Sequence, residues 1–423
     1  MNVERTTLSA DLAVQETTAD VPVVGIYLVG AGVVGSAILQ AHLDAGVTVW
    51  LVDQDQDAIV SALQRVRFDD GDWDVSSVQK FTDSMSAIQF RRREQPLSCK
   101  QTLVIESIVE KLEVKQAFFA EAEQVFGDQA LLCTNTSTLS VSRIAESLER
   151  PERFSGMHFF MPVAERPAVE LIAGGETHAA TTQACISHVQ RLGKEPLVVG
   201  DGPAFVVNRL LSPYLNEAML LLCRGVSASR IENAALRYGM PMSPLELIDW
   251  IGMSTMFDAG RAFWQAFPRR LDPAPLLVAM IKSKRFGRAA DAGFYDYVEG
   301  RRSAELATRS VELCQEYCKT EWALEDGEIR DLLAIPMWIE AACAFKDGVV
   351  SDHHSFDLAM SGGLGYEHQQ SWHGYFDSLG SDHVLRAVDT WAVHARAMHA
   401  PLALLELLRT HSPTQALVEY AEV

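Results

Sequence analysis

Short apolar runs alternate with amphipathic stretches over the first half of the chain. The runs are rich in branched residues, and several end at a glycine or an acid. Such a run is typical of a strand buried on both faces of a parallel sheet. The expected strands are residues 23–29, 47–52, 102–105, 130–133, 157–160, 169–173 and 196–199. Their alternation with helical patterns at 36–45, 111–125 and 181–192 predicts a doubly wound α/β domain.

After residue 203 the pattern changes, and only helical periodicity remains. The expected helices are residues 205–224, 229–238, 244–251, 256–267 and 275–283, with no clear strand among them. Gly200-Asp201-Gly202-Pro203 is a natural hinge between the two parts, because glycine and proline interrupt regular structure. The sequence therefore predicts a Rossmann-type α/β domain followed by an all-α region.

A repeat within the helical part predicts that this region is made of two related domains. Leu210-Leu211-Ser212-Pro213 is echoed by Leu333-Ala334-Ile335-Pro336. The spacing from each proline to the next glutamate and glycine is the same in both copies: Glu217 and Gly225, then Glu340 and Gly348. Chance similarity between two helical segments is the alternative. The expected organisation is a disordered lead (1–22), a dinucleotide-binding domain (23–202), a helical domain (203–301) and a degenerate second copy (302–423).

Charge and cysteine content exclude several classes of protein. The 423 residues include 36 Lys and Arg against 56 Asp and Glu, a net charge of −20 that argues against nucleic acid or an anionic membrane as partner. No apolar run approaches the ~20 residues needed to cross a bilayer. Seven cysteines, an odd number, fit a reduced, cytoplasmic protein. We expect no metal site; Cys314 with Cys318, and the histidines at 353, 354, 368 and 373, are the alternatives considered.

A glycine-rich motif lies between the first expected strand and helix. It reads Gly30-Ala31-Gly32-Val33-Val34-Gly35, and Asp53 follows the second strand, 18 residues beyond Gly35. The first glycine permits a tight turn, the second lets backbone approach a pyrophosphate, and the third lets helix and strand pack closely. Asp53 is expected to accept hydrogen bonds from ribose hydroxyls. Its neighbours include no arginine that could bind the 2′-phosphate of NADP. The motif predicts NAD as cofactor, with a glycine turn in another kind of α/β protein as the alternative.

Candidate catalytic residues follow the glycine motif along the chain. His158 ends one expected strand and Glu170 lies twelve residues later on the next, so the two are expected to pair across a hairpin. A histidine suits removal of a hydroxyl proton at neutral pH, and a carboxylate fixes its tautomer. Ser137 and Asn208 are candidate donors to a substrate oxygen. A core histidine and ordinary turn chemistry are the alternatives.

Several motifs together resemble one family. Gly156-Met157-His158-Phe159-Phe160-Met161-Pro162 resembles the His-Phe-Phe-Asn-Pro signature of the 3-hydroxyacyl-CoA dehydrogenase family. Further matches in the family's order lie at 104–115, 135–139, 202–211, 239–247 and 287–295, so the resemblance covers about residues 23–300. It implies an NAD-dependent oxidoreductase that interconverts 3-hydroxyacyl and 3-oxoacyl thioesters, by default of coenzyme A. It also places Glu110, Lys115 and Asn135 at the cofactor, and Ser137, Met161 and Asn208 at the substrate.

Three departures from the family keep alternatives open. Met161 stands where the family has asparagine, and Ala204 replaces the hinge glycine. Residues 58–87 form a shorter arm without the lysines that hold the CoA nucleotide in the family; Arg91, Arg92, Arg93 and Lys100 offer another basic patch. An acyl-carrier-protein substrate and a non-catalytic NAD-binding protein are therefore the alternatives. For Glu110 and Lys115 the alternative is a solvated helix start.

Multifunctional fatty acid oxidation members of the family carry two helical domains in one chain. By this resemblance, we expect the second copy to pack on the first as an internal pseudo-dimer. The protein is then a monomer, with a homodimer as the alternative.

Overall fold

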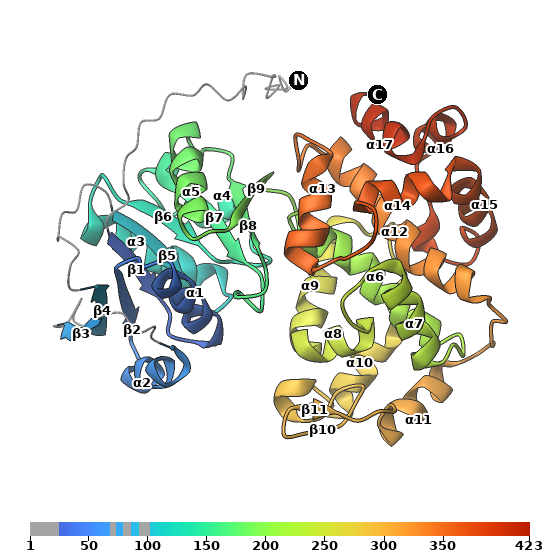
Figure 1. Ribbon diagram of the computed structural model, residues 1–423, viewed down its shortest axis with the longest axis horizontal. Coiled ribbons are helices and arrows are strands. Elements are labelled where there is room, and N and C mark those ends of the chain that lie inside the picture. The colour runs from blue at the N-terminus through green and yellow to red at the C-terminus, as the bar shows by residue number, and fades with distance from the viewer. Residues whose placement is uncertain (1–24, 68–72, 79–85, 93–101) are drawn as a thin grey trace.

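A computed structural model describes residues 25–67, 73–78, 86–92 and 102–423 of the chain. They form an α/β lobe and a larger helical lobe, which Figure 1 shows side by side. The predicted lead (1–22), Arg93, Lys100 and part of the expected arm lie outside the described residues, as do the side chains of Arg91 and Arg92. The basic patch proposed there therefore stays a prediction.

Within the described ranges, nine strands form one sheet in the order β3-β4-β2-β1-β5-β6-β7-β8-β9. Its centre is parallel, from β2 to β7, while β8 runs antiparallel to β7 and β9 runs parallel to β8. The strands are β1 (Gly25–Val29), β2 (Val49–Asp53), β3 (Trp73–Val78), β4 (Ser86–Arg92), β5 (Thr102–Glu106), β6 (Leu131–Thr134), β7 (Phe154–Phe159), β8 (Ala168–Ala173) and β9 (Glu195–Gly200). The predicted doubly wound domain is confirmed.

Helices cover both faces of this sheet, and their apolar sides form two cores. One core contains α1 (Val33–Asp44), α2 (Gln56–Arg65) and α5 (Ala179–Arg191). The other contains α3 (Leu112–Phe126) and α4 (Val141–Ala145) and is continuous with the core of the helical lobe. The strand order reverses at β1 and β5: strand β2 was added on one side of β1, and β5, β6 and β7 on the other. Ligands of such sheets bind at this switch point, beside the carboxyl ends of the strands.

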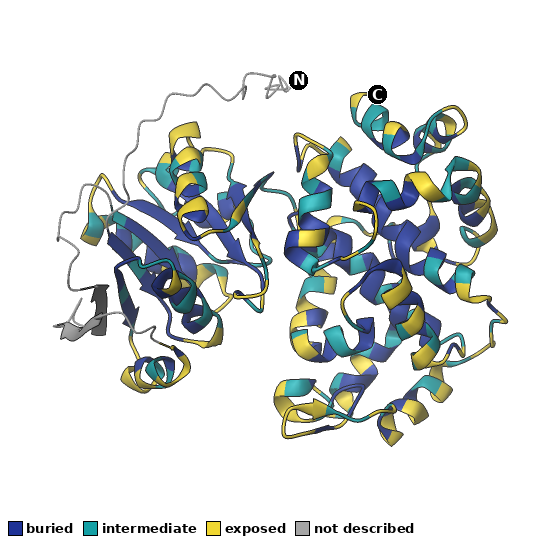
Figure 2. Cartoon of the chain, in the orientation of Figure 1, coloured by how far each residue is buried: buried dark blue, intermediate teal, exposed yellow. Residues whose placement is uncertain are grey.

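The helical lobe is built around two long, adjacent helices. Its elements are α6 (Val207–Leu222), α7 (Ala228–Tyr238), α8 (Pro244–Ile251), α9 (Met253–Ala266), α10 (Pro275–Lys282), α11 (Thr308–Tyr317), α12 (Asp326–Lys346), α13 (His354–Leu358), the π-helix η3 (Ala359–Leu364), α14 (Trp372–Leu379), α15 (Ser381–Trp391), α16 (Leu402–Leu408) and α17 (Pro413–Glu422). Helices α6 and α12 pack along each other, and Figure 2 shows their region as the most buried part of the lobe. None of the helices formed by the described residues is long and apolar enough to cross a membrane.

The two predicted copies share backbone features at matched positions. Helices α6 and α12 each contain an internal proline, Pro213 and Pro336. Gly225 and Gly348 follow them with φ of 80° and 74°, a left-handed conformation that glycine adopts without steric cost. In each copy a later glycine also joins two helices, Gly252 between α8 and α9 and Gly380 between α14 and α15. These shared features support the predicted duplication, and the duplication and its boundaries stay predictions. Residues 302–423 are called the second helical unit below.

Several elements differ from the sequence analysis. Helices α2 and α4 and strands β3 and β4 were not predicted, although Ile88-Gln89-Phe90-Arg91 alternates apolar and polar residues as a strand does. The expectation of no strands beyond residue 203 is wrong in one place. Strands β10 (Tyr297–Val298) and β11 (Arg301–Arg302) form a small hairpin, whose two-residue strands are too short to show a periodicity.

Candidate active site

The glycine-rich loop between β1 and α1 has the geometry of a dinucleotide cradle. Gly30 has a φ of 109°, and a β-carbon there would lie 2.3 Å from the carbonyl oxygen of Ser107. A β-carbon on Gly35 would lie 1.9 Å from the carbonyl oxygen of Gly30, so helix and strand approach closely. Gly32 is exposed and has open space around its missing side chain. The three glycines therefore fit the roles predicted for them, and the open side is where a pyrophosphate fits.

Asp53 lies at the end of β2, facing this loop. Its Oδ2 accepts a hydrogen bond from the amide of Ala31 at 2.7 Å, and its Oδ1 accepts one from the amide of Asp55 at 2.9 Å. The carboxylate therefore fixes the loop, and its partly exposed position leaves it accessible to a ribose hydroxyl. Val33 and Val34 begin the helix, whose N-terminus has no side-chain cap. Contact of these residues with the cofactor stays a prediction.

His158 and Glu170 meet as expected from the sequence. They are direct cross-strand partners in the antiparallel pair β7–β8, so both side chains lie on the same face of the sheet. The Nδ1 atom of His158 lies 2.8 Å from Oε2 of Glu170. Both residues are buried, with 8% of His158 and none of Glu170 exposed. The prediction that they pair is confirmed.

The second oxygen of Glu170 is held by the helical lobe. Oε1 accepts hydrogen bonds from the backbone amides of Val206 and Val207, at 2.9 and 3.0 Å. These amides begin helix α6, where the helix dipole stabilises negative charge. The carboxylate thus bridges the two lobes, and both of its oxygens have partners.

The segment that enters α6 is conformationally constrained. Ala204 and Phe205 have φ values of 65° and 51°, the left-handed region that costs a non-glycine residue about 1–2 kcal/mol. Because Ala204 stands at the hinge position where the related family has glycine, the lobes are joined by a strained segment. Phe205 also packs near His158, with ring centroids 6.2 Å apart.

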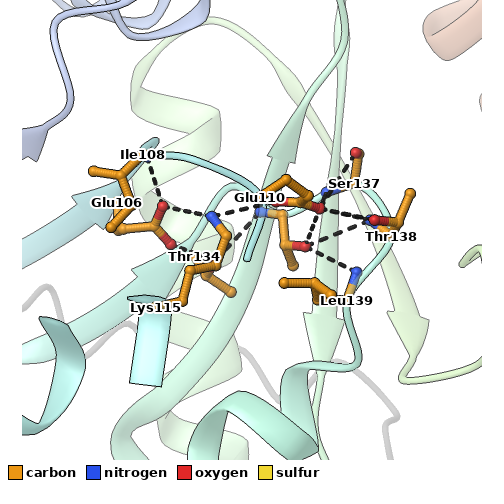
Figure 3. A network of polar contacts seen from close by, with 9 residues as sticks. Glu106, Ile108, Glu110, Lys115, Thr134, Ser137, Thr138 and Leu139 are labelled. Carbon is orange, nitrogen blue, oxygen red and sulfur yellow. Dashed lines mark hydrogen bonds and ion pairs between the residues drawn. The ribbon is translucent and has the colours of Figure 1, made fainter. Parts of the chain in front are cut away.

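A buried ionic cluster lies behind the cofactor loop, and Figure 3 shows its contacts. The ammonium of Lys115, 1% exposed, lies 2.5 Å from Oε1 of Glu106 and 3.3 Å from Oε2 of Glu110. Glu106 is fully buried and also accepts hydrogen bonds from Thr134 and the amide of Ile108. The alternative of a solvated helix start is therefore wrong for Lys115. The predicted contact of Glu110 and Lys115 with the cofactor stays a prediction.

Glu110 also organises the turn that carries Ser137. Its Oε1 accepts from the hydroxyl of Thr136 at 2.6 Å and from the amides of Ser137 and Thr138 at 3.0 and 3.1 Å. Burial alone raises the pKa of Glu110, but the charge of Lys115 and these donors outweigh it, and the pKa is lowered. A charged carboxylate therefore holds the turn in one conformation.

Two asparagines connect this turn to the His158–Glu170 pair, called the dyad below. Oδ1 of Asn135 accepts from the amide of Phe159, next to His158, at 2.8 Å. Nδ2 of Asn208 donates to the carbonyl oxygen of Ser137 at 3.0 Å. These contacts connect Ser137, in the loop after β6, and Asn208, in α6, to the pair formed by His158 of β7 and Glu170 of β8. Their roles toward a substrate stay a prediction.

Met161 follows β7 and is 45% exposed. It lines a cavity of about 740 Å³ together with Val33 of the cofactor loop, Arg65 and Lys194. Its thioether offers no N–H donor, whereas the asparagine that the family has at this position offers two. A substrate-binding role for Met161 stays a prediction.

Sequence reasoning missed three contributors to the site. Glu106 ends strand β5, and an acid at the end of a buried strand was an available signal. The amides of Val206 and Val207 carry no side-chain signal, because any residue supplies a backbone N–H.

Among the described residues, Asp352, His353 and His354 also bring potential metal-ligand atoms within 4.8 Å of one another, far along the chain from this site.

Comparisons with known proteins agree with the division into a dinucleotide-binding lobe and a helical lobe. Residues 25–202 match the model of the 3-hydroxyacyl-CoA dehydrogenase NAD-binding domain, and residues 205–297 match that family's C-terminal domain. The fatty acid oxidation complex subunit alpha of Acinetobacter baumannii strain SDF is 32% identical over 315 residues, 72% of this chain and 44% of that protein. The chain thus spans less than half the length of this relative. The first match confirms NAD as the cofactor.

Solved structures show the same fold. A 3-hydroxybutyryl-CoA dehydrogenase from Escherichia coli K12 is 22% identical with a TM-score of 0.69, covering 95% of this chain and 100% of the other. An (S)-3-hydroxybutyryl-CoA dehydrogenase from Ralstonia eutropha is 28% identical with a TM-score of 0.53, covering 66% and 100%. With both domains matched, the chain belongs to the 3-hydroxyacyl-CoA dehydrogenase family.

Proposed function

We propose that the protein oxidises a 3-hydroxyacyl thioester to the 3-oxoacyl thioester with NAD, and catalyses the reverse reduction. Coenzyme A is the proposed carrier of the acyl group. The observation that carries the proposal is the His158–Glu170 pair, buried in the same sheet that carries the glycine-rich loop and held by the first amides of α6. This arrangement supplies a positioned base, whereas a protein that only binds NAD needs none.

The hydrogen bond to Glu170 selects the tautomer of His158. Because Nδ1–H donates to the carboxylate, the proton of the substrate hydroxyl goes to Nε2. The chemistry that NAD would supply when bound is to accept a hydride from the carbon that bears this hydroxyl, so that the alcohol would lose one proton and one hydride. The imidazolium that forms is stabilised by the charge of Glu170. In the reverse direction Nε2 returns the proton to the forming alkoxide.

Ser137 and Asn208 are proposed to hold the substrate oxygen. The amide of Asn208 has two N–H bonds, and one of them is used on the carbonyl of Ser137. The other, with the Ser137 hydroxyl, is available to an oxygen on which negative charge develops. Because the two residues contact each other from different lobes, both can reach one atom.

The test is oxidation of NADH by the purified protein in the presence of acetoacetyl-CoA. The variant His158→Gln is expected to lose at least ~99% of the turnover, since removing a general base costs about 10²–10⁴-fold. His354→Gln is the matched control, because His354 lies exposed on the helical lobe. Both variants are expected to bind NADH like the wild type.

Other outcomes assign the protein differently. Turnover only with an acyl-carrier-protein thioester would keep the reaction and replace the carrier. NADH binding without turnover of either thioester would overturn the proposal in favour of a non-catalytic NAD-binding protein. Full activity of His158→Gln would remove His158 from its role.

A further inference from the structure

The second helical unit contacts the site through a π-helical turn. In η3, Gly362 and Gly363 are both buried. A β-carbon on Gly362 would lie 2.7 Å from Cβ of Ala168, at the start of β8. A β-carbon on Gly363 would lie 2.9 Å from Cγ2 of Val207 and 3.3 Å from the ring of Phe160. The turn therefore packs tightly against both lobes, and π-helical turns occur frequently at functional sites.

Both side chains that face Gly363 are neighbours of the dyad. The backbone amide of Val207 donates to Glu170 at 3.0 Å. The ring of Phe160 packs edge-on against His158, with centroids 4.9 Å apart. A displacement of either side chain is therefore transmitted to one member of the His–Glu pair.

The first turn of α6 has a second attachment to the same unit. Arg209, which follows Asn208, is 1% exposed, and its Nε lies 2.5 Å from Oε1 of Glu340 in α12. One of its two terminal nitrogens, Nη2, pairs with Oδ2 of Asp347. At the hinge, the amide of Gly200 donates to the carbonyl of Val349 at 2.8 Å. The second unit thus holds this turn from several directions, although it supplies none of the reacting groups.

We propose that Gly363 is a positioning residue for the dehydrogenase site: it seats the first turn of α6 so that the amides of Val206 and Val207 meet Glu170. This inference rests on the proposed function. Gly363 touches neither substrate nor cofactor and acts through Val207 and Phe160. A larger side chain at this position pushes against Val207, because the β-carbon contact of 2.9 Å is closer than real β-carbons show.

The test compares Gly363→Ala with Gly327→Ala. Gly327 lies in the first turn of α12, and a β-carbon there meets nothing within 4 Å, so it is a matched control in the same unit. Turnover is expressed per NADH-binding site, which counts folded enzyme only. We expect kcat of Gly363→Ala to fall about tenfold with unchanged KM for NADH, because sub-ångström misplacement of reacting groups lowers rate rather than cofactor affinity.

An activity-free measurement examines the same contact. Hydrogen–deuterium exchange at the amides of Val206 and Val207 is expected to accelerate at least ~tenfold in Gly363→Ala and to stay unchanged in Gly327→Ala. Adding Val207→Ala to Gly363→Ala removes the methyl that the new β-carbon meets and keeps the amide. The double variant is therefore expected to recover slow exchange and most of the lost kcat.

Three results would overturn the proposal. The first is that Gly363→Ala keeps the kcat and the amide exchange rates of the wild type. The second is that exchange accelerates equally in the distant strand β1, and the third is that the double variant recovers neither kcat nor slow exchange. If the wild type turns over no thioester, the proposed function fails by itself, and the exchange rates still decide whether Gly363 seats this turn.

Discussion

Replacing Glu170 by glutamine is a direct test of how the dyad works. Glu170 Oε1 accepts two backbone amides, and Oε2 faces Nδ1 of His158 at 2.8 Å. A glutamine that keeps its oxygen on Val206 and Val207 turns its NH2 toward Nδ1. His158 must then accept at Nδ1 and carry its proton on Nε2, which is the wrong tautomer for a base.

The opposite orientation of the amide is worse for folding. It keeps an oxygen toward His158 but places the NH2 against the two amide donors, which leaves buried N–H groups unpaired. Such a loss costs about 1–3 kcal/mol of stability. The first orientation is therefore expected, and the analogous acid-to-amide change in a Ser-His-Asp protease lowers kcat about 10⁴-fold. We expect a fall of about 10³–10⁴-fold in kcat, or about 4–5.5 kcal/mol of activation free energy.

The assay follows NADH absorbance with acetoacetyl-CoA at saturation, and a NADH titration counts active sites. Glu176→Gln is the control, because Glu176 is exposed on the loop after β8. We expect it to behave like the wild type. A kcat of Glu170→Gln within about threefold of the wild type would refute the reasoning, since the carboxylate would then set neither the tautomer nor the charge balance.

Three further predictions concern the cofactor loop and the buried charges. Asp53→Asn is expected to raise KM for NADH about 10- to 100-fold in steady-state kinetics, because a charge-assisted acceptor contributes ~1.5–3 kcal/mol. Lys115→Met leaves Glu106 and Glu110 without their cation and is expected to cost about 3–5 kcal/mol in urea unfolding. Burial lowers the pKa of His42 to about 4 and that of His188 well below 6.5, so the unfolded state binds more protons below pH 6.5. Stability should thus fall from pH 6.5 toward pH 4, and His42→Leu combined with His188→Leu should flatten that slope in pH-dependent unfolding.

The parallel core of the sheet was predictable because its strands are buried on both faces. Continuous apolar runs such as 102–105 have no other stable location in an α/β domain. The His158–Glu170 pair was predictable because the strands that carry it are consecutive in the chain, and consecutive strands joined by a short loop commonly form an antiparallel pair. Strand β3 is the edge strand of the sheet and β4 lies next to it, and their alternation of polar and apolar residues is too weak to predict a strand.

The contacts that complete the site were not predictable from residue types. Glu170 is fixed by two backbone amides, and a backbone amide has the same chemistry in every residue. A solvated helix start remained the alternative for Lys115 because the spacing between Glu110 and Lys115 is commonplace in sequences. Its burial depends on Glu106, nine residues earlier on another element, which is a tertiary contact.

The second helical unit shows why a domain without reacting groups remains connected to the chemistry. Asp331 occupies the position that corresponds to Asn208, and it is used in an ion pair with His383 at 2.8 Å. This unit therefore offers no second site. The dyad lies in one lobe while the amides that hold Glu170 lie in the other, so the geometry of the base depends on how the lobes sit together. Contacts of the second unit with Gly200, Val207 and Arg209 fix that arrangement from within one chain. All of these contacts are made within one chain, and the monomeric state stays a prediction.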